Sequence, residues 1–410
     1  MSEYQYYEFQ AIDRPLTKEE MDALRAISSR ATITSTRLVN VYHYGDFKGE
    51  PLVLMQRYFD AHVYVANWGT HTFMLRLPRR LMPKATVDLY IRRDDLTDDG
   101  VVQHAYGNSV ILEFKSQREE AEWEEGDDWL TSLLPLRTAL AEGDLRSLYL
   151  AWLAYAYASS FDEDDEAAYE EEDDEDEDQE EHYEPLEPPV PPGLGDLTPS
   201  LKSLAEFLRL DKDLIAVAAE RSAMLPKSPP SSAGLSAWIA ALPPAEKDSL
   251  LLRLAEGNES HLQMELLRRF RDATASERRA GTESADGGRS IKELLALANE
   301  HTAERLRGEA EQSARERAKQ EQQQALARAA YLDKLRGQEE KLWQQIDKLA
   351  EAKRAKEYDQ AAELLKDLHD LSHRLGTQNA FQIRLHELRA RHLGRPALIA
   401  RFDQVGGASR

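Results

Sequence analysis

The sequence predicts two different halves: an α+β N-terminal domain with a mainly antiparallel sheet and short helices, and a mostly α-helical C-terminal half with a long helix or coiled coil. In the first part of the chain, β-branched and aromatic runs mix with short helical patterns, which is typical of α+β domains. After residue 198, apolar residues recur at helical spacing almost to the end. Between Asp162 and Glu187 stand eighteen Asp or Glu and no Lys or Arg, and this acidic run separates the two halves.

Alternating and β-branched runs mark the expected strands of the N-terminal domain. Residues 4–12 (YQYYEFQAI) alternate and are rich in aromatic side chains, as a half-buried strand should be. Residues 31–44 are β-branched and predict a second strand. Residues 61–78 hold two alternating runs on either side of Gly69, which predicts a β-hairpin. Further strands are expected at residues 85–91 (ATVDLYI) and 109–115 (SVILEFK).

Helix signals fall between and after these strands. Thr17 and Glu20 form a capping box, in which each side chain accepts a hydrogen bond from the backbone N–H of the other residue. A proline starts residues 51–59 (PLVLMQRYF), which suits the first turn of a short helix. Longer helices are expected at residues 129–141 and 144–158. The second of these is apolar on more than one face, so we expect it to pack against the sheet.

Composition divides the rest of the chain into linkers and helical segments. An acidic run cannot bury enough apolar surface to offset its ordering entropy, and the prolines that follow it favour an extended chain. We therefore predict an α+β domain over residues 1–158, an acidic and proline-rich disordered linker over 159–197, a helical domain over 198–273, a flexible break over 274–289, a long helix or coiled coil over 290–357 and a helical hairpin over 358–403.

The long helix carries a short heptad seam. Its members keep mostly to alternating steps of three and four: Leu332, Leu335, Leu342, Ile346 and Leu349. Upstream of the seam few apolar residues recur at helical spacing, and Gly337 is a point where the helix can bend. A long antenna or coiled coil is favoured over a folded-back bundle. We expect the seam, together with Tyr358 and Leu365 of the hairpin, to bind a partner protein or a second copy of the chain.

The net charge of -23 comes mostly from one segment. Residues 1–150 hold 17 basic and 24 acidic side chains, residues 151–192 hold none and 18, and residues 193–410 hold 35 and 33. The expected folded parts are therefore close to neutral, and the total charge does not indicate the class of partner.

The absence of cysteine excludes disulfides, Cys-ligated zinc, iron–sulfur clusters and thiol nucleophiles. This composition fits a reducing cytosol. The first ten residues show no secretory signal, and the longest apolar stretch, residues 145–158, is shorter than the roughly 20 residues that span a bilayer. We therefore expect a cytoplasmic protein with no membrane contact.

The α+β domain shows no recognisable catalytic or metal-binding motif. Its four histidines are His43, His62, His71 and His104. They lack the spacing of metal ligands, so we expect ordinary histidines beside aromatic residues, and neither a metal nor a cofactor. Gly45 and Gly49 bracket a turn rather than a phosphate loop, because the Gly-Lys-Ser/Thr ending of a P-loop is missing. With no nucleophile in a recognisable elbow, these observations argue against an enzyme. A third interpretation, an enzyme with an unfamiliar site in this domain, would need a deep polar cleft lined by His43, His62 or His71.

Two clusters in the N-terminal domain have both a structural and a binding interpretation. The aromatic cluster is Tyr42, His43, Tyr44, Trp68 and His71. It packs in the core or offers a surface to a peptide or a base, and core packing is favoured. The basic cluster is Arg76, Arg79, Arg80, Arg92 and Arg93. The favoured interpretation is that these charges keep a solvated sheet edge from pairing with another strand. The alternative is that the cluster binds a phosphate or carboxylate, with Arg79 and Arg80 as the candidate binding residues.

The tail and the acidic run also allow alternatives. The basic residues of the tail are Arg384, Arg389, Arg391, Arg395 and Arg401. Two interpretations are favoured: these residues form a solvated helix face, or they contact the acidic run. The third is that they bind nucleic acid through residues such as Arg389 and Arg391. For the acidic run, a soluble spacer is the favoured interpretation. The alternatives are a docking tail for a basic protein, a mimic of nucleic acid and a weak site for divalent cations.

Three stretches resemble known families. Residues 6–28 (YYEFQAIDRPLTKEEMDALRAIS), with YHYGDFKG and LMQRYFDAHVYVANWGT, resemble a family of uncharacterised bacterial proteins. The tail, with YDQAAELLKDL and FQIRLHELRARH, resembles C-terminal stretches of bacterial proteins related to SWIM-type zinc-finger proteins. The cysteines of that finger are missing, so no metal site carries over. Ala355, Tyr358, Ala361, Ala362 and Leu365 are similar to the UVR-type hairpin of nucleotide-excision-repair proteins, which pairs with a like hairpin on a partner.

The resemblances imply a bacterial origin and no activity. The sequence therefore predicts a non-enzymatic interaction or scaffold protein that tethers protein partners through its helical half and its α+β domain. The alternative is a nucleic-acid-associated or phage-defence-type factor that uses the basic tail, or an acidic segment that mimics nucleic acid. Nucleic acid is not the favoured partner.

Overall fold

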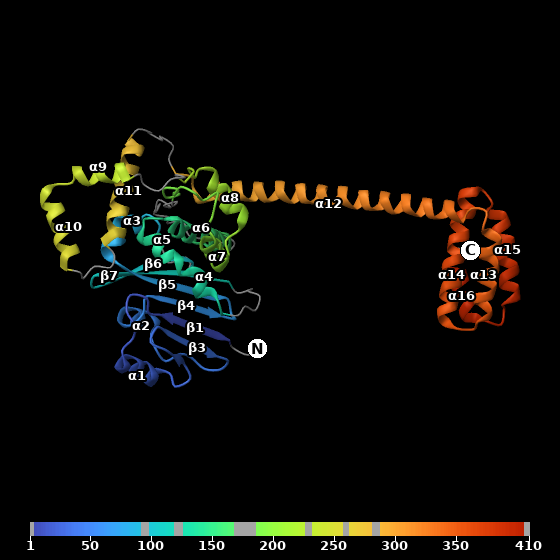
Figure 1. Ribbon diagram of the computed structural model, residues 1–410, viewed down its shortest axis with the longest axis horizontal. Coiled ribbons are helices and arrows are strands. Elements are labelled where there is room, and N and C mark those ends of the chain that lie inside the picture. The colour runs from blue at the N-terminus through green and yellow to red at the C-terminus, as the bar shows by residue number, and fades with distance from the viewer. Residues whose placement is uncertain are drawn as a thin grey trace, which may run out of the picture. The chain divides into compact units, whose positions relative to one another are not determined.

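The computed structural model describes residues 4–91, 98–118, 126–167, 186–225, 232–256, 262–280 and 288–405. Most of the acidic run and residues 281–287 of the expected flexible break, together with Arg92 and Arg93, lie outside these residues, whereas residues 274–280 of that break continue helix α11 (Leu262–Ala280). The chain forms two compact units, Met1–Glu304 (unit 1) and Arg305–Arg410 (unit 2). The predicted fold class is confirmed, because unit 1 holds an antiparallel sheet with short helices and the C-terminal half is helical and includes a long helix (Figure 1).

Within the described part of unit 1, seven antiparallel strands form one sheet in the order β2-β3-β1-β4-β5-β7-β6 (Figure 1). Their bounds are β1 Gln5–Gln10, β2 Thr32–Ile33, β3 Arg37–Tyr42, β4 Ala61–Ala66, β5 Thr70–Pro78, β6 Gly100–Tyr106 and β7 Ser109–Gln117. The pairs β2-β3, β4-β5 and β6-β7 are neighbours in sequence, whereas β1 lies between β3 and β4. Phe9 of β1 therefore stands opposite Leu38 on one side and His62 on the other.

Helices lie on both faces of this sheet. The helices that begin in unit 1 are α1 Lys18–Ile27, α2 Pro51–Arg57, the 3-10 helix η1 Arg79–Leu81, α3 Lys84–Val87, α4 Trp129–Leu133, α5 Pro135–Ala141, α6 Arg146–Ala167, α7 Pro199–Phe207, α8 Lys212–Glu220, α9 Ser232–Ala241, α10 Pro244–Glu256, α11 Leu262–Ala280 and α12 Ile291–Leu335.

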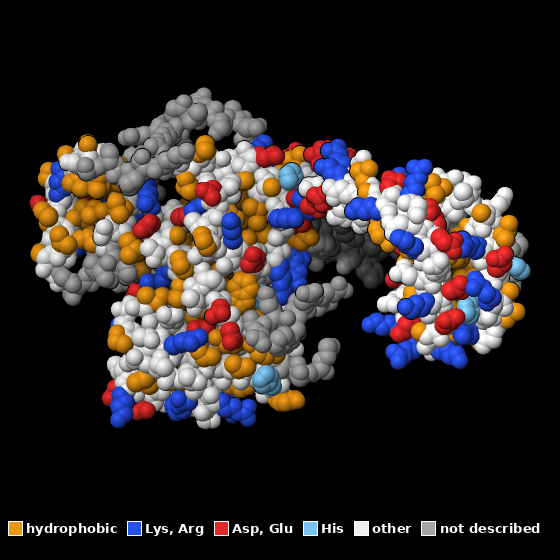
Figure 2. Space-filling model, turned by 45° about the vertical axis from the view of Figure 1, so that its right-hand side comes forward, with side chains coloured by type: hydrophobic (Ala, Val, Ile, Leu, Met, Phe, Trp, Pro, Cys, Tyr) orange, Lys and Arg blue, Asp and Glu red, His pale blue; other side chains and the backbone are white. Residues whose placement is uncertain are grey.

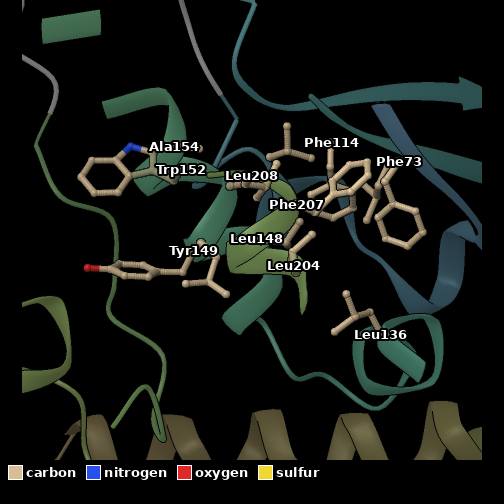
Figure 3. Close-up of a cluster of buried hydrophobic side chains, with 14 of the residues drawn as sticks. Phe73, Phe114, Leu136, Leu148, Tyr149, Trp152, Ala154, Leu204, Phe207 and Leu208 are labelled. Carbon is tan, nitrogen blue, oxygen red and sulfur yellow. The ribbon is translucent and has the colours of Figure 1, made fainter. Parts of the chain in front are cut away.

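The larger core packs α4–α8 against one face of the sheet. Phe73 and Phe114 project from the strands toward Phe207 at the end of α7, and Leu148 of α6 lies beside them (Figure 3). The first turns of α12 complete this core through three side chains: Ile291, Leu294 and Ala298. Helix α12 therefore begins as part of unit 1 and ends in unit 2.

The smaller core packs α1 and α2 against the other face. Its buried side chains include Phe9 and Leu38 from the strands, Leu24 from α1, Met55 from α2 and Phe59 just after it. Helix α2 contacts β4 and β5. A hollow remains beside the start of α2, over β4, β5 and β7.

Several local predictions are confirmed in unit 1. Thr17 caps α1 and forms the expected capping box with Glu20. Helix α2 begins at Pro51. The hairpin β4-β5 turns at Gly69, whose φ of +94° lies in a region that L-residues rarely adopt.

Other predictions about unit 1 are wrong. Residues 85–91 form no strand, and α3 covers their start because Val87 and Tyr90 turn into the larger core. Strand β6 was not predicted: it is an edge strand whose second half is exposed, so its apolar pattern is weak. Pro135 divides the helix expected over residues 129–141 into α4 and α5.

The segment after the acidic run is ordered and belongs to unit 1. Leu186 forms an isolated β-bridge with Ser290, and the buried side chains of Glu187 and Arg289 form an ion pair of 2.8 Å. Helices α7 and α8, which we expected in a separate domain, pack in the same core as the sheet, since Leu194 and the apolar faces of both helices are buried there. The acidic run thus starts within α6 and ends in the same unit that it leaves.

Helices α9, α10 and α11 follow α8 in unit 1. Helix α11 contacts α5 and η1, and its Glu265 forms ion pairs with Arg80 at 3.3 Å and with Arg253 of α10 at 2.6 Å. Trp238 of α9 packs edge-to-face on Phe270 of α11. Helix α10 contributes no buried residue.

Over its described residues, 305–405, unit 2 contains the end of α12 and four more helices. Their bounds are α13 Glu339–Glu351, α14 Ala355–Leu375, α15 Gln378–Arg391 and α16 Pro396–Val405. The helix expected over residues 290–357 is broken, because Gly337 has a φ of +80° that ends α12 and starts α13. The expected hairpin over 358–403 consists of three helices around one core, to which Ile346, Leu365 and Phe402 contribute. A long helix and a folded-back helical unit therefore both occur.

Candidate functional site

A cavity of about 460 Å³ lies on the face of the sheet that carries α1 and α2. Its lining comes from β1, β4, β5 and β7, from the start of α2 and from a residue two positions before β6: Tyr7, Glu50, Pro51, Leu52, His62, Tyr64, Thr70, Thr72, Met74, Asp98, Glu113, Lys115, Ser116 and Gln117. This volume is within the range of small-molecule sites, about 300–1,000 Å³. The cavity is therefore the candidate ligand site of unit 1.

The strand register places the polar floor of this cavity. His62 stands opposite Met74, which stands opposite Glu113, so the three side chains form one row across β4, β5 and β7. The next row is Tyr64, Thr72 and Lys115. Residues that are far apart in sequence meet here because antiparallel partners point to the same face.

Glu113 is an ionised carboxylate at this floor. One of its oxygens, Oε2, lies 2.6 Å from Nε2 of His104, and Nζ of Lys115 lies 3.5 Å from Oε1. Burial alone raises the pKa of Glu113, but the hydrogen bond from His104 and the charge of Lys115 together hold it below its usual range. Glu113 therefore carries a negative charge at neutral pH, although its exposed fraction is only 8%.

His62 is a neutral imidazole at this floor. Its ring is 1% exposed, stacks on Phe9 at 4.0 Å between centroids, and has a pKa that burial lowers to about 4. Nδ1 lies 2.8 Å from the carbonyl oxygen of Glu8, which can only accept, so Nδ1 carries the hydrogen. Nε2 is then a hydrogen-bond acceptor, and it has no partner among the described residues.

Two tyrosines form one wall of the cavity. The hydroxyls of Tyr7 and Tyr64 both donate to Oε1 of Gln5, at 2.7 and 3.3 Å. Burial raises the pKa of Tyr64 to about 12 and that of Tyr7 further, so both stay protonated. Gln5 is itself held by Asp46, which accepts from its Nε2 at 3.0 Å. The wall is therefore uncharged and fixed in position.

The four histidines do not converge. His43 is exposed beside the ring of Tyr4, whereas His71 lies on the opposite face of the sheet from the cavity and packs on Phe207. Only His62 and His104 belong to the cavity region. Across the described segments, no three His, Asp or Glu side chains lie close enough to hold a metal ion.

The structure does not gather the aromatic cluster into one surface either. Tyr42 is buried in the smaller core, and His71 is buried on the opposite face. Tyr44 and Trp68 are exposed.

The basic cluster is also dispersed. Arg76 pairs with the buried Asp60 at 2.7 Å, and Arg80 pairs with Glu265 of α11. Arg79 reaches only the backbone oxygen of Gly107, at 3.5 Å.

The seam residues of the long helix lie inside unit 2. Leu332, Leu342 and Ile346 are buried there, and Leu335 and Leu349 pack partly buried against the same core. Tyr358 and Leu365 of α14 are buried in this core as well. A partner could reach these side chains only by displacing helices of unit 2.

The basic tail is largely matched by acids of the same unit. Arg384 pairs with Glu340, Arg389 with Asp403, Arg391 with Asp347 and Arg401 with Asp359, at 2.6–2.9 Å. Each pair joins two different helices: two connect α15 to α13, one connects α15 to α16 and one connects α16 to α14. Exposed pairs of this kind contribute about 0–1 kcal/mol each. Their position indicates that these arginines fasten the helices of unit 2 together.

An apolar surface that we did not predict lies on α10. Leu251, Leu252 and Leu254 are 62%, 61% and 64% exposed, and we call them the leucine surface. Figure 2 shows hydrophobic side chains gathered over α9 and α10. Leu251 and Leu254 have the helical spacing of an apolar stripe that packs in a core, but α10 contacts α11 through charged side chains instead: Arg253 with Glu265, and Glu246 with Arg269.

Comparison of the chain with family profiles, with curated proteins and with solved structures finds no match. The resemblances noted in the sequence therefore stay predictions. In the segments that the structure describes, no helix is both long and apolar enough to cross a bilayer.

Proposed function

We propose that this protein is a non-enzymatic interaction protein, and that the leucine surface of α10 is where unit 1 docks on a partner protein. The observation that carries this proposal is the exposure of three neighbouring leucines on a helix that buries none of its residues. Contiguous exposed apolar side chains are uncommon on monomers and typically mark an interaction site.

The energetics favour a partner at this surface. Burying a leucine side chain fully contributes about 1.5–3 kcal/mol, so a groove that covered all three would gain several kcal/mol. Helix α10 has 13 residues, a length that is marginal for a helix without packing. A partner that binds the apolar face of such a helix also stabilises the helix itself.

Unit 2 is the second module in this proposal. The seam residues Leu332 to Leu349 stabilise its core, and its outer helix faces are left for contact with a second protein. The chain would then connect two partners through two separately folded units. This retains the tethering role inferred from the sequence and changes the docking element from the seam to α10.

A pair of matched variants tests the docking surface. Leu251→Asp with Leu254→Asp places charge in the leucine surface, whereas Leu326→Asp places it at a lone leucine of α12 that is equally exposed, at 64%. Tagged full-length chains would be used to capture partners from the native host, with quantitative mass spectrometry of the captured proteins and light scattering of the pure chain.

We expect one stoichiometric partner with the wild type and with the Leu326 variant, and its loss with the α10 double variant. Circular dichroism spectra that match the wild type would show that both variants fold. If the three chains capture the same proteins in the same amounts, the docking role of α10 is wrong. A wild-type mass above the 46.6 kDa of one chain that falls in the double variant alone would identify the partner as a second copy.

A further inference from the structure

We propose that the cavity beside α2 binds a small organic amine in its ammonium form. The ammonium group donates hydrogen bonds to Glu113 and to Nε2 of His62, and the hydrocarbon part packs on Leu52 and Met74. This site is distinct from the leucine surface, and it adds a small-molecule ligand to the interaction role. The charge, the hydrogen-bonding groups and the shape of the cavity each support it.

The charge of the lining selects a cation. Its acidic residues are Glu50, Asp98 and Glu113, and its only basic residue is Lys115. His62 is neutral at physiological pH because burial lowers its pKa to about 4. The lining therefore has an excess of negative charge, and the ammonium of Lys115 is already directed at Glu113.

The hydrogen-bonding groups require a donor from the ligand. Nε2 of His62 is an acceptor on a side chain that is 99% buried, and no described residue donates to it. The oxygens of Glu113 offer about four lone-pair positions, of which His104 and Lys115 use two.

The register brings these acceptors within reach of one group. His62 and Glu113 lie on either side of Met74 in a single cross-strand row. With neighbouring strands ~4.8 Å apart, their Cα atoms are roughly 10 Å apart and their side chains point to the same face. An ammonium group has three N–H donors and can bond to both sides at once.

The remaining lining suits the hydrocarbon part of an amine. Leu52, Pro51 and Met74 are apolar, and the rings of Tyr7 and Tyr64 offer faces that attract cations. The volume of about 460 Å³ admits a ligand with a single ring or a short chain. A carboxylate of the same size would meet Glu113 and the lone pair of His62, and both would repel it.

Calorimetric titration of the full chain with two matched probes tests this site. Phenethylamine and 3-phenylpropionate share a ring and a two-carbon arm, and they differ in the sign of their charge. Salt at about 150 mM screens attraction of amines to the negative charge of the acidic run. The variants are Glu113→Gln and His62→Phe, and the matched control is Glu309→Gln, which removes an exposed charge on α12.

We expect saturable 1:1 binding of phenethylamine to the wild type and to the Glu309 variant, and at least tenfold weaker binding to the Glu113 and His62 variants. No saturable binding of phenethylamine to the wild type would overturn the proposal. Equal binding of 3-phenylpropionate, or wild-type affinity in both cavity variants, would also overturn it.

Near-ultraviolet circular dichroism would establish whether each cavity variant is folded. If only one of the two variants folds, its affinity for phenethylamine alone decides the test. The Leu251/Leu254 double variant should bind phenethylamine as the wild type does, so a failure of the docking proposal would leave this result unchanged.

Discussion

Gly69 makes the turn between β4 and β5 possible. Its φ is +94°, and a Cβ atom at this position would stand 1.6 Å from the backbone oxygen of Arg118. We expect Gly69→Ala to destabilise unit 1 by about 3 kcal/mol or more, because the new methyl group displaces backbone as well as straining φ. Urea denaturation followed by circular dichroism would measure the change.

Gly107 in the turn between β6 and β7 is the matched control. Its φ of +53° is left-handed, but nothing lies within 4 Å of the position of a Cβ atom. Gly107→Ala should therefore cost only the left-handed strain, about 1–2 kcal/mol. Equal losses of stability in the two variants would show that the contact with Arg118 has no energetic weight.

Asp99 makes the stability of unit 1 depend on pH. It is 1% exposed, its Oδ1 accepts from the backbone N–H of Gln117 at 2.6 Å, and burial raises its pKa to about 6. The carboxyl of an unfolded chain titrates near 4. Between about pH 4 and pH 6, Asp99 is ionised in the unfolded chain and still protonated in the folded chain. The free energy of unfolding therefore falls as the pH rises through this window.

Asp99→Asn retains the oxygen acceptor and removes the charge. We expect it to raise the free energy of unfolding at pH 7 by up to about 3 kcal/mol, and to have no effect below pH 4, where both forms of the wild type are protonated. Chemical denaturation at the two pH values is the measurement. A gain of the same size at both would contradict the role of ionisation.

The buried histidines act in the opposite direction. Burial lowers the pKa of both His62 and His71 to about 4, below the value of about 6.5 for an unfolded chain. The stability that they contribute is complete above pH 6.5 and is lost as the pH falls toward 4. Two such groups outweigh one Asp99, so unit 1 of the wild type should weaken on acidification through this window.

At the scale of elements, an ion pair joins the segment that precedes α7 to the residues just before α12. Arg289 donates to both carboxylate oxygens of Glu187 at 2.8 Å, and the hydroxyl of Tyr149 donates to the same carboxylate. Removing one member leaves the other charge buried without its partner. We expect Glu187→Leu or Arg289→Met alone to cost about 3–5 kcal/mol.

The double substitution should cost less than the sum of the two single ones, because it leaves no unpaired charge. A double-mutant cycle by urea denaturation measures this coupling. Strictly additive losses would indicate that the two side chains stabilise unit 1 independently.

Elements with strong local signals could be predicted from the sequence. The capping box at Thr17, the proline that starts α2 and the glycine turn after β4 each depend on a few adjacent residues. Residues 85–91 were assigned to a strand because they are β-branched and apolar. Val87 and Tyr90 are buried in the larger core and only the start of the segment is helical, and no local pattern reports such a tertiary contact.

The candidate site could not be predicted because it depends on register. His62 was noted as one of four histidines, but Glu113 and Lys115 lie on a strand some fifty residues later. Only the pairing of β4, β5 and β7 places them in adjoining rows. Likewise, the leucines of α10 fit a core pattern in sequence, and their exposure follows from the way α11 holds the helix by charged contacts.

At the scale of the whole molecule, two separate sets of core residues imply two unfolding events. The core residues of unit 1 end with Ala298, and the buried residues of unit 2 begin with Leu332. Leu204→Ala and Leu365→Ala remove matched, fully buried side chains from the two units. Each should destabilise its own unit by about 2–5 kcal/mol.

Differential scanning calorimetry should show two transitions, of which Leu204→Ala lowers the midpoint of one and Leu365→Ala that of the other. A single transition that both variants shift equally would mean that the units unfold together.

The place of α12 in the larger core has a consequence for synthesis on the ribosome. The sheet is complete when β7 emerges, but Ile291, Leu294 and Ala298 are added much later in the chain. At about 5–20 residues per second, this delay is on the order of tens of seconds. During that time the nascent sheet lacks part of its apolar cover. Chaperone binding to stalled chains should therefore fall sharply once residue 298 has left the exit tunnel.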